Sequence, residues 1–429
     1  MRAKNMTSIR QTSRNLRNVL SGELLLRVAN IGVAVLIGRV YGAAVLGIYA
    51  AIIASATLAE RLSDDGMELA GIEEVSKEPA HASRIVTALY IDKTILSSLA
   101  ILALVGVASL GKLSAASRVM AVILTARTFL YSYCRLHAGV LKALEKTGGL
   151  LRIQSAHFGL LVSALLLVYF RGASLVTLLL CLLAAQTFEF LATALLLERH
   201  GLRPAKVTRK LCRSLLYRST PIGLTYTFST IMLRGDVLVP SLLLPVATLG
   251  SLVAADTGLV MVYVVAWLFS GVLLADLGRA AGNRELFDTH FRRCITVLSQ
   301  IAIPSSVASF FLIPAAIRVL FGKNFTAAGQ PGAIMAAAIP FIFLNAAYLS
   351  RAIARNASKV CLTIYGVTAI LSVALNWILG SGYGVTGIAC SIVIREALMT
   401  AGFASFGKLS STARDFPIAI SGESELPTC

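Results

Sequence analysis

Charged residues are scarce in this sequence. Asp, Glu, Lys and Arg make up 14% of the 429 residues, whereas a soluble protein carries about 25%, and 57% of the residues are hydrophobic. Acidic residues are fewer than basic ones: the sequence has 21 Asp and Glu and 39 Lys and Arg, for a formal net charge of +18. This composition is that of an integral membrane protein, in which Lys and Arg collect in cytoplasmic loops.

The residues that build disulfides and metal sites are also few. The seven cysteines are odd in number and scattered, without Cys-x-x-Cys spacing, and the five histidines do not cluster. Neither a disulfide framework nor a zinc site is supported. A phosphate-binding Gly-x-x-x-x-Gly-Lys-Ser/Thr loop is missing as well. We therefore predict no metal, no cofactor and no catalytic residue.

A basic segment, residues 198–218, interrupts the hydrophobic sequence almost at its midpoint. Long hydrophobic runs flank it, so we interpret it as a cytoplasmic linker between two membrane-embedded halves. A nucleic-acid-binding segment is the alternative, and the flanking runs disfavour it. One acid, Glu198, accompanies seven cations: Arg199, Arg203, Lys206, Arg209, Lys210, Arg213 and Arg218.

The hydrophobic runs predict an all-α polytopic membrane protein with about twelve transmembrane helices in two six-helix lobes. Each run can cross the ~30 Å hydrocarbon layer at about 1.5 Å per residue. The N-lobe is expected at 20–197 and the C-lobe at 219–405, between cytoplasmic tails at 1–19 and 406–429. The expected spans are 20–41, 47–67, 86–109, 119–140, 153–170, 174–197, 219–243, 250–277, 295–320, 332–350, 360–380 and 385–405.

The charges of the loops predict the orientation. With the N-terminus inside, the inside loops hold most of the loop Lys and Arg, whereas the outside loops hold only Lys112, Arg118, Arg171 and Lys323. A missed helix would invert the bias in every later loop. Both termini are therefore expected on the cytoplasmic side of a bacterial inner membrane. The outside loops are too short for a catalytic domain, which disfavours an enzyme.

A faint internal repeat relates the two halves. Residues 44–47 (Ala-Val-Leu-Gly) match residues 247–250 (Ala-Thr-Leu-Gly) at an offset of 203, and Glu189 and Glu396 lie at an offset of 207. Six spans per half is an even number, so the halves share one orientation in the membrane. The repeat favours a two-lobed transporter.

Several stretches resemble a known family. They are GELLLRVANIGVAVLIGRVYGAAVLGIYAAIIASATLAERLSDDG at 22–66, STPIGLTYTFSTIMLRGDVLV at 219–239, VLFGKNFTAAGQPGAIMAAAIPF at 319–341 and NWILGSGYGVTGIACSIVIREAL at 376–398. Together they resemble the Wzx-type polysaccharide flippases of the multidrug/oligosaccharidyl-lipid/polysaccharide superfamily. The resemblance implies a two-lobed fold like that of the multidrug transporters and a lipid-linked oligosaccharide substrate. The related lipid II flippases usually have fourteen spans, which makes that branch a poorer match.

Polar residues inside the predicted spans are the candidate functional residues, because a charge at mid-bilayer costs about 2.5–3.5 kcal/mol or more unless it faces water or a partner. In the first span Glu23 and Arg27 lie four residues apart, with Asn30 one turn further. They form either a neutral structural pair or a cavity arginine oriented by the acid. Similar flippases place a cavity arginine in this helix.

Span four is the strongest indication of a hydrated chamber. Arg127, Tyr131 and Arg135 recur every four residues on one face, and their helix contains no acid. Unpaired arginines are costly against lipid, so we expect them to face water rather than to extend to the membrane surface. In the spans at 219–243 and 385–405, Arg234 is expected to pair with Asp236, whereas the adjacent Arg395 and Glu396 are expected to point apart.

These residues lead to a predicted function. Arginine binds phosphate oxygens through paired donors, so the expected function is flipping of polyprenyl-pyrophosphate-linked oligosaccharide by alternating access. Polysaccharide polymerase and glycosyltransferases are expected partners, membrane lipids surround the chain, and nucleic acid is not expected. The alternatives are a multidrug/cation antiporter, a polysaccharide polymerase or ligase, and a non-transporting scaffold. Predicted substrate-binding residues are Arg27, Asn30, Arg127, Tyr131, Arg135 and Arg234, and predicted coupling or gating residues are Glu23, Glu189, Asp236 and Glu396.

Overall fold

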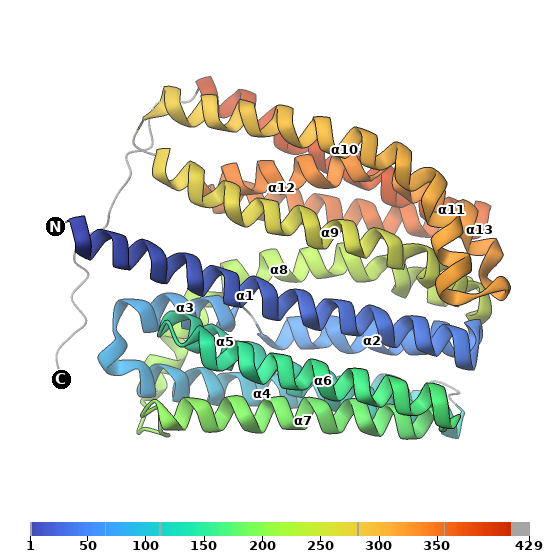
Figure 1. The fold of residues 1–429 in the computed structure, drawn as a ribbon, viewed down its shortest axis with the longest axis horizontal. Coiled ribbons are helices and arrows are strands. Elements are labelled where there is room, and N and C mark those ends of the chain that lie inside the picture. Colours follow the sequence, from blue (N-terminus) through green and yellow to red (C-terminus); the bar gives the residue numbers. More distant parts are fainter. Residues whose placement is uncertain (1, 65, 111–113, 281–282, 356, 413–429) are drawn as a thin grey trace.

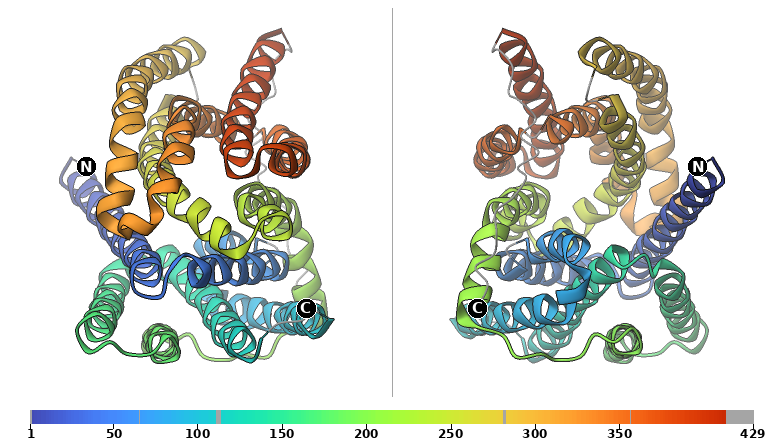
Figure 2. Two further views of the ribbon diagram at one scale, coloured as in Figure 1. Left: turned by 90° about the vertical axis from the view of Figure 1, so that its right-hand side faces the viewer. Right: turned by 90° about the vertical axis from the view of Figure 1, so that its left-hand side faces the viewer.

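The computed structural model describes residues 2–64, 66–110, 114–280, 283–355 and 357–412. Over these ranges the chain is almost entirely helical and contains no strand, which confirms the all-α prediction. Long helices run along one common axis (Figure 1). Viewed along that axis, they divide into two groups, α1–α7 and α8–α13 (Figure 2).

The first group contains the helices of the N-terminal half. A π-helical turn, η1, extends α1, and Gly66, with φ +75°, makes the turn between α2 and α3. Only glycine adopts that backbone conformation without strain. The elements are α1 (Arg2–Leu36), η1 (Ile37–Tyr41), α2 (Ala43–Asp64), α3 (Met67–Lys77), η2 (Pro79–His81), α4 (Ala82–Leu110), α5 (Ala115–Ala143), α6 (Thr147–Arg171) and α7 (Leu175–Arg199).

The second group follows the same plan with longer helices. Gly384 has φ +58° and ψ −135° and divides α13 into two arms, at the turn that the sequence predicts between 380 and 385. The elements are α8 (Arg209–Leu243), α9 (Val246–Ala280), α10 (Arg284–Phe321), η3 (Lys323–Ala328), α11 (Gly329–Ala336), α12 (Ile339–Ala354) and α13 (Ser358–Thr412).

Each of the twelve expected spans coincides with a helix, with the pair α11 and α12, or with one arm of α13. By length and apolarity, eight helices of the described ranges are long and apolar enough to cross a membrane, or nine if the bent pair is one span. Two that fall short are α5 and α8, which carry the charged residues of interest. Their polarity fits helices that face protein or water more than lipid.

The linker is shorter than the sequence indicates. Only residues 200–208 lie between α7 and α8, because the rest of the basic segment is already helical. The side chain of Thr208 caps this helix by accepting a hydrogen bond from the backbone of Leu211. Leu215 is buried among N-lobe residues, and Leu211 and Leu216 pack beside it. These apolar residues recur at helical spacing between the cations, which is why the segment folds as a helix.

The two groups of helices meet along α2, which packs against both α8 and α9. At the end opposite the linker, the crossing is backbone against backbone. A Cβ on Gly47 would lie 2.1 Å from the Val246 carbonyl oxygen, and one on Gly250 would lie 1.8 Å from the Ala43 carbonyl oxygen. Both glycines end the repeated motif at 44–47 and 247–250. The repeat therefore builds a reciprocal contact between the lobes.

Candidate functional site

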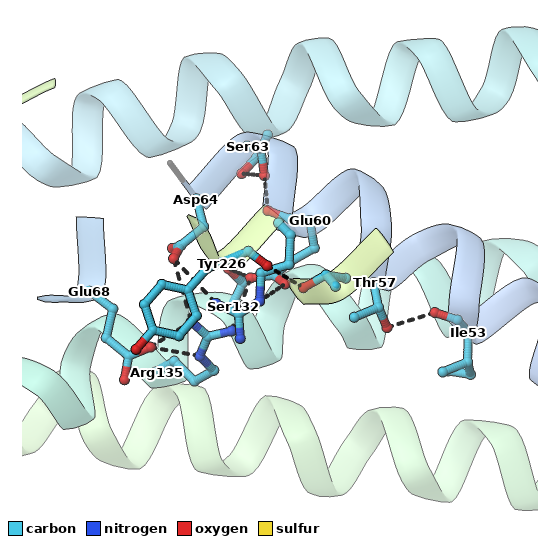
Figure 3. Close-up of polar contacts among 12 residues, drawn as sticks. Ile53, Thr57, Glu60, Ser63, Asp64, Glu68, Ser132, Arg135 and Tyr226 are labelled. Atoms are coloured by element: carbon cyan, nitrogen blue, oxygen red, sulfur yellow. Dashed lines mark hydrogen bonds and ion pairs between the residues drawn. The ribbon is translucent and has the colours of Figure 1, made fainter. Parts of the chain in front are cut away.

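A cluster of buried charges occupies the N-lobe where α2, α3, α4 and α5 meet (Figure 3). Arg135 of α5 is its centre. Its guanidinium donates to Glu68 at 2.5 Å and to Asp64 at 3.4 Å, and its Nη1 lies 3.6 Å from Glu60 Oε1. Lys93, which is completely buried, donates to Asp64. Arg135 is thus surrounded by carboxylates.

Two further contacts complete this cluster. Ser132 donates to Glu60, and Arg61 lies 3.7 Å from Asp64. The six charged side chains are three carboxylates and three cations, so the cluster is neutral. They are Glu60, Arg61, Asp64, Glu68, Lys93 and Arg135.

The prediction that Arg135 is unpaired is therefore wrong. Its own helix holds no acid, but α2 and α3 supply three. Their positions at 60, 64 and 68 repeat every four residues, as Arg127, Tyr131 and Arg135 do. The matching four-residue spacing of these acids and of the arginines on α5 is the sequence signal that could have predicted the pairing. Arg135 stabilises the packing of α2 and α3 on α5.

Arg127 has a different environment, although it lies on the same helix. It is 9% exposed, and its Nη2 donates to Asn30 Oδ1 of α1 at 2.8 Å. The amide of Asn30 donates in turn to the carbonyl of Leu26 at 2.9 Å. Within the described ranges no carboxylate pairs with Arg127, and its Nε is buried without a hydrogen-bond partner. Arg127 therefore keeps an uncompensated charge inside the protein.

Arg27 of α1 lies within electrostatic range of both Tyr131 of α5 and Arg234 of α8. The Tyr131 ring is 40% exposed, although charged groups from α1, α3, α5 and α7, Arg27 among them, lie within electrostatic range. Arg234 of α8 has Arg27 and Arg61 of the N-lobe and Asp256 of α9 within the same range. Of the described residues, none forms an ion pair with Arg234. Guanidinium groups of both lobes thus approach one another.

The predicted pairing of Glu23 with Arg27 is not found. Glu23 instead pairs with Lys142 of α5, with Nζ and Oε1 3.0 Å apart. This pair lies toward the linker end of α1 and joins α1 to α5. Glu23 therefore does not orient Arg27 directly.

A second polar cluster lies inside the C-lobe around Arg395. This side chain is 1% exposed and donates to Asp236 at 2.5 Å and to Glu396 at 3.0 Å. Asn376 donates to Asp236 at 2.9 Å, and Asn345 donates to Glu396 at 2.8 Å. Both acids are thus held by fixed donors.

These contacts correct two predictions. Asp236 pairs with Arg395 of α13 and not with Arg234, because residues two apart on a helix point to different sides. Arg395 and Glu396 do interact despite being adjacent, since the long arginine side chain curls back to its neighbour. The acids of the C-lobe are buried inside the lobe.

Glu189 forms a third polar group, between α6 and α7. Its Oε2 lies 2.6 Å from His157 Nδ1 and accepts from Gln186 at 2.8 Å. All three side chains are at most 3% exposed, and the Nε2 of His157 is buried without a partner among the described residues. Tyr131 and Cys134 of α5 have Glu189 within electrostatic range. This buried acid and histidine therefore lie close to Tyr131.

The predicted substrate-binding residues therefore separate into two sets. Asn30 holds Arg127, and Arg27 lies within electrostatic range of Tyr131 and Arg234. Arg135 also lies near Tyr131 but forms the ion pairs of the neutral cluster. The predicted site residues did not include Glu60, Glu68, Tyr226 and Asp256, nor Lys93, whose side chain is fully buried. Tyr226 of α8 lies 5.9 Å, ring centroid to Cζ, from Arg61 and so brings the C-lobe to the N-lobe cluster.

Comparisons with known proteins agree with this architecture. The model of a family described as polysaccharide biosynthesis protein matches residues 14–274, more than half of the chain. No curated protein sequence matches this chain. Among solved structures, the lipid II flippase MurJ in an inward closed conformation is similar with a TM-score of 0.76 and 16% identity, over 91% of this chain and 87% of that one.

Two further solved structures share the fold. An inward-facing multidrug resistance MATE family transporter of the MOP superfamily gives a TM-score of 0.68 and 16% identity, over 90% of this chain and 96% of that one. A MOP superfamily transporter from Pyrococcus furiosus gives a TM-score of 0.65 and 14% identity, over 93% of this chain and 95% of that one. At such identities the likeness shows the fold alone, and it confirms the predicted two-lobed membrane fold.

Proposed function

The chain belongs to the polysaccharide biosynthesis protein family, and from this membership we propose that it is a flippase for polyprenyl-pyrophosphate-linked oligosaccharide. It would move the glycolipid from the cytoplasmic to the outer leaflet of a bacterial inner membrane by alternating access between the two lobes. Glycosyltransferases that build the glycolipid inside and a polymerase that consumes it outside are the partners that this function implies.

The observation that carries the proposal is the uncompensated guanidinium of Arg127. A buried charge in a membrane protein is expensive unless it has a partner, and here the partner is the neutral Asn30. Arg234 likewise has no ion pair within the described ranges, and Arg27 lies near it. A pyrophosphate group brings the missing negative charge, and guanidinium binds its oxygens through paired donors. The sugar would occupy the polar space while the prenyl tail stays in lipid.

The membrane potential is a sufficient driving force for this transfer. Moving one elementary charge across the membrane is worth about 2.3 kcal/mol per 100 mV. A doubly negative head group therefore moves outward with roughly twice that free energy. Transport of this kind uses the charge of the substrate itself.

A multidrug/cation antiporter of the same fold fits these residues less well. Such a transporter needs carboxylates that are free to bind a cation, yet Asp236 and Glu396 are both engaged by Arg395. Asp256, within range of Arg234, is the acid best placed to serve that function. If Asp256→Asn abolished drug resistance in cells while glycolipid transport was intact, the antiporter would be the better assignment.

Replacing Arg127 and Arg234 together with Gln tests the proposed function. We expect the double variant to lose at least ten-fold in the rate at which proteoliposomes flip a fluorescent polyprenyl-pyrophosphate glycolipid, because each charged hydrogen bond to phosphate contributes about 1.5–3 kcal/mol. Cells that carry it should accumulate the glycolipid on the cytoplasmic face. Arg318→Gln is the matched control, because it removes an exposed charge near the C-terminal end of α10. An unchanged flipping rate in the double variant would exclude this substrate site.

The buried pair of His157 and Glu189 gives a prediction about coupling. Glu189 is the proposed coupling residue, because the pair can hold one proton between Nδ1 and Oε2. We expect an imposed proton gradient to change the flipping rate of the native protein and Glu189→Gln to lose this response, because the variant removes the carboxylate that contacts His157. His137→Gln is the control, since this equally buried histidine contacts the hydroxyl of Thr193 and no carboxylate. The same response to the gradient in the native protein and in Glu189→Gln would remove the coupling role.

A further inference from the structure

Two arginine side chains lie over aromatic rings where α10 begins and α12 ends. The guanidinium of Arg351 is 4.6 Å from the centre of the Phe291 ring, and that of Arg355 is 4.8 Å from the centre of the Phe287 ring. Both phenylalanines are buried, and Tyr348 packs against Phe291 with ring centres 5.5 Å apart. The rings therefore hold the two guanidinium groups in place.

One carboxylate oxygen holds both arginines. Asp288 Oδ1 accepts from Arg355 Nη2 at 2.9 Å and lies 3.5 Å from Arg351 Nη2. Each guanidinium has five N–H donors, and the described residues provide no other hydrogen bond to either side chain. The side chains of Arg351 and Arg355 are 18% and 30% exposed, so part of each can reach a ligand.

The charge around this carboxylate is not balanced. Arg292 of α10 also lies within electrostatic range of Arg351, and among the described residues Asp288 is the only acid that pairs with Arg351 or Arg355. The C-terminus of α12 adds only a partial negative charge. A structural salt bridge would account for one arginine and Asp288. The surplus positive charge calls for an anion.

We propose that Arg351 and Arg355 bind the phosphate group of an anionic lipid in the cytoplasmic leaflet. This end of α12 lies at the linker end of the bundle (Figure 1), which the loop charges predict to be cytoplasmic. Anionic lipids are enriched in that leaflet, and they attract basic residues at its surface. Two preorganised guanidinium groups offer the paired donors that phosphate oxygens accept. The site is separate from Arg127 and does not depend on what the protein transports.

Native mass spectrometry of the detergent-solubilised protein tests the proposal. Three probes are compared: phosphatidylglycerol, a short prenyl pyrophosphate and the zwitterionic phosphatidylcholine. We expect the native protein to retain at least one anionic probe and to release phosphatidylcholine. Preference for phosphatidylglycerol would identify a phospholipid site, and preference for the prenyl pyrophosphate a docking site for the transported lipid. Equal retention of all three would overturn the proposal.

Charge-matched variants separate this site from general attraction to a basic protein. Arg351→Gln/Arg355→Gln should weaken retention at least ten-fold, whereas Lys210→Gln/Arg213→Gln, which removes two exposed charges from α8, should not. Asp288→Asn removes the competing carboxylate and should strengthen retention. This last variant covers the case in which the arginine variants fail to fold. Weaker or unchanged retention in Asp288→Asn, or equal loss in both double variants, would contradict the proposal.

Discussion

Replacing Lys93 with methionine is expected to lower the free energy of unfolding by about 3 kcal/mol. The ammonium is completely buried and donates to Asp64, and the surrounding cluster is neutral only while Lys93 is charged. Methionine has a similar length but would leave one negative charge in excess inside the N-lobe. The midpoint of thermal unfolding in detergent should fall by roughly 6–12 °C, at about 2–4 °C per kcal/mol for a unit of about 200 residues.

The second half of this experiment restores neutrality. Lys93→Met/Asp64→Asn removes one charge of each sign and should recover most of the lost stability, because buried pairs are costly mainly when broken. Lys77→Met is the control on α3: its Nζ lies 2.5 Å from Glu73, but both side chains are more than half exposed. An exposed pair contributes about 0–1 kcal/mol. A double variant no more stable than Lys93→Met would show that charge balance does not determine the stability of this cluster.

The fold was predictable because its signals are local. Apolar runs long enough to span the membrane mark each helix, and single glycines such as Gly384 mark turns where the backbone needs a positive φ. The end of the linker was misjudged for a physical reason. Its cations are interleaved with Leu211, Leu215 and Leu216, so a polar composition concealed an amphipathic helix.

The site was less predictable because its pairings are not local. Arg127 and Arg135 lie two helical turns apart on α5 and look equivalent in the sequence. They differ because α2 and α3 bring Glu60 and Glu68 to Arg135, whereas α1 brings only Asn30 to Arg127. Which acid meets which arginine depends on how the helices pack, and that arrangement is set by contacts far apart in the chain.

Replacing Gly250 with alanine is expected to reduce transport at least ten-fold by holding the lobes apart at the end opposite the linker, which we predict to be outside. The added Cβ would lie 1.8 Å from the Ala43 carbonyl oxygen and 2.6 Å from the Ala43 carbonyl carbon. Both are backbone atoms, so no side chain can rotate to relieve the clash. The helices α2 and α9 must separate instead. Gly47→Ala should act in the same way, because its Cβ would meet the Val246 carbonyl oxygen at 2.1 Å.

A second measurement with Gly250→Ala shows whether the crossing of α2 and α9 opens during transport or stays closed. In an alternating-access transporter, separating the lobes here should expose Leu46, which is completely buried. A cysteine at that position should then react faster with a membrane-impermeant thiol reagent added outside. Gly258→Ala on the same helix is the control, since its Cβ would meet only the Ile313 side chain, at the ordinary distance of 3.5 Å. Lower stability without faster labelling would mean that this crossing is a permanent part of the core, and that the lobes open elsewhere.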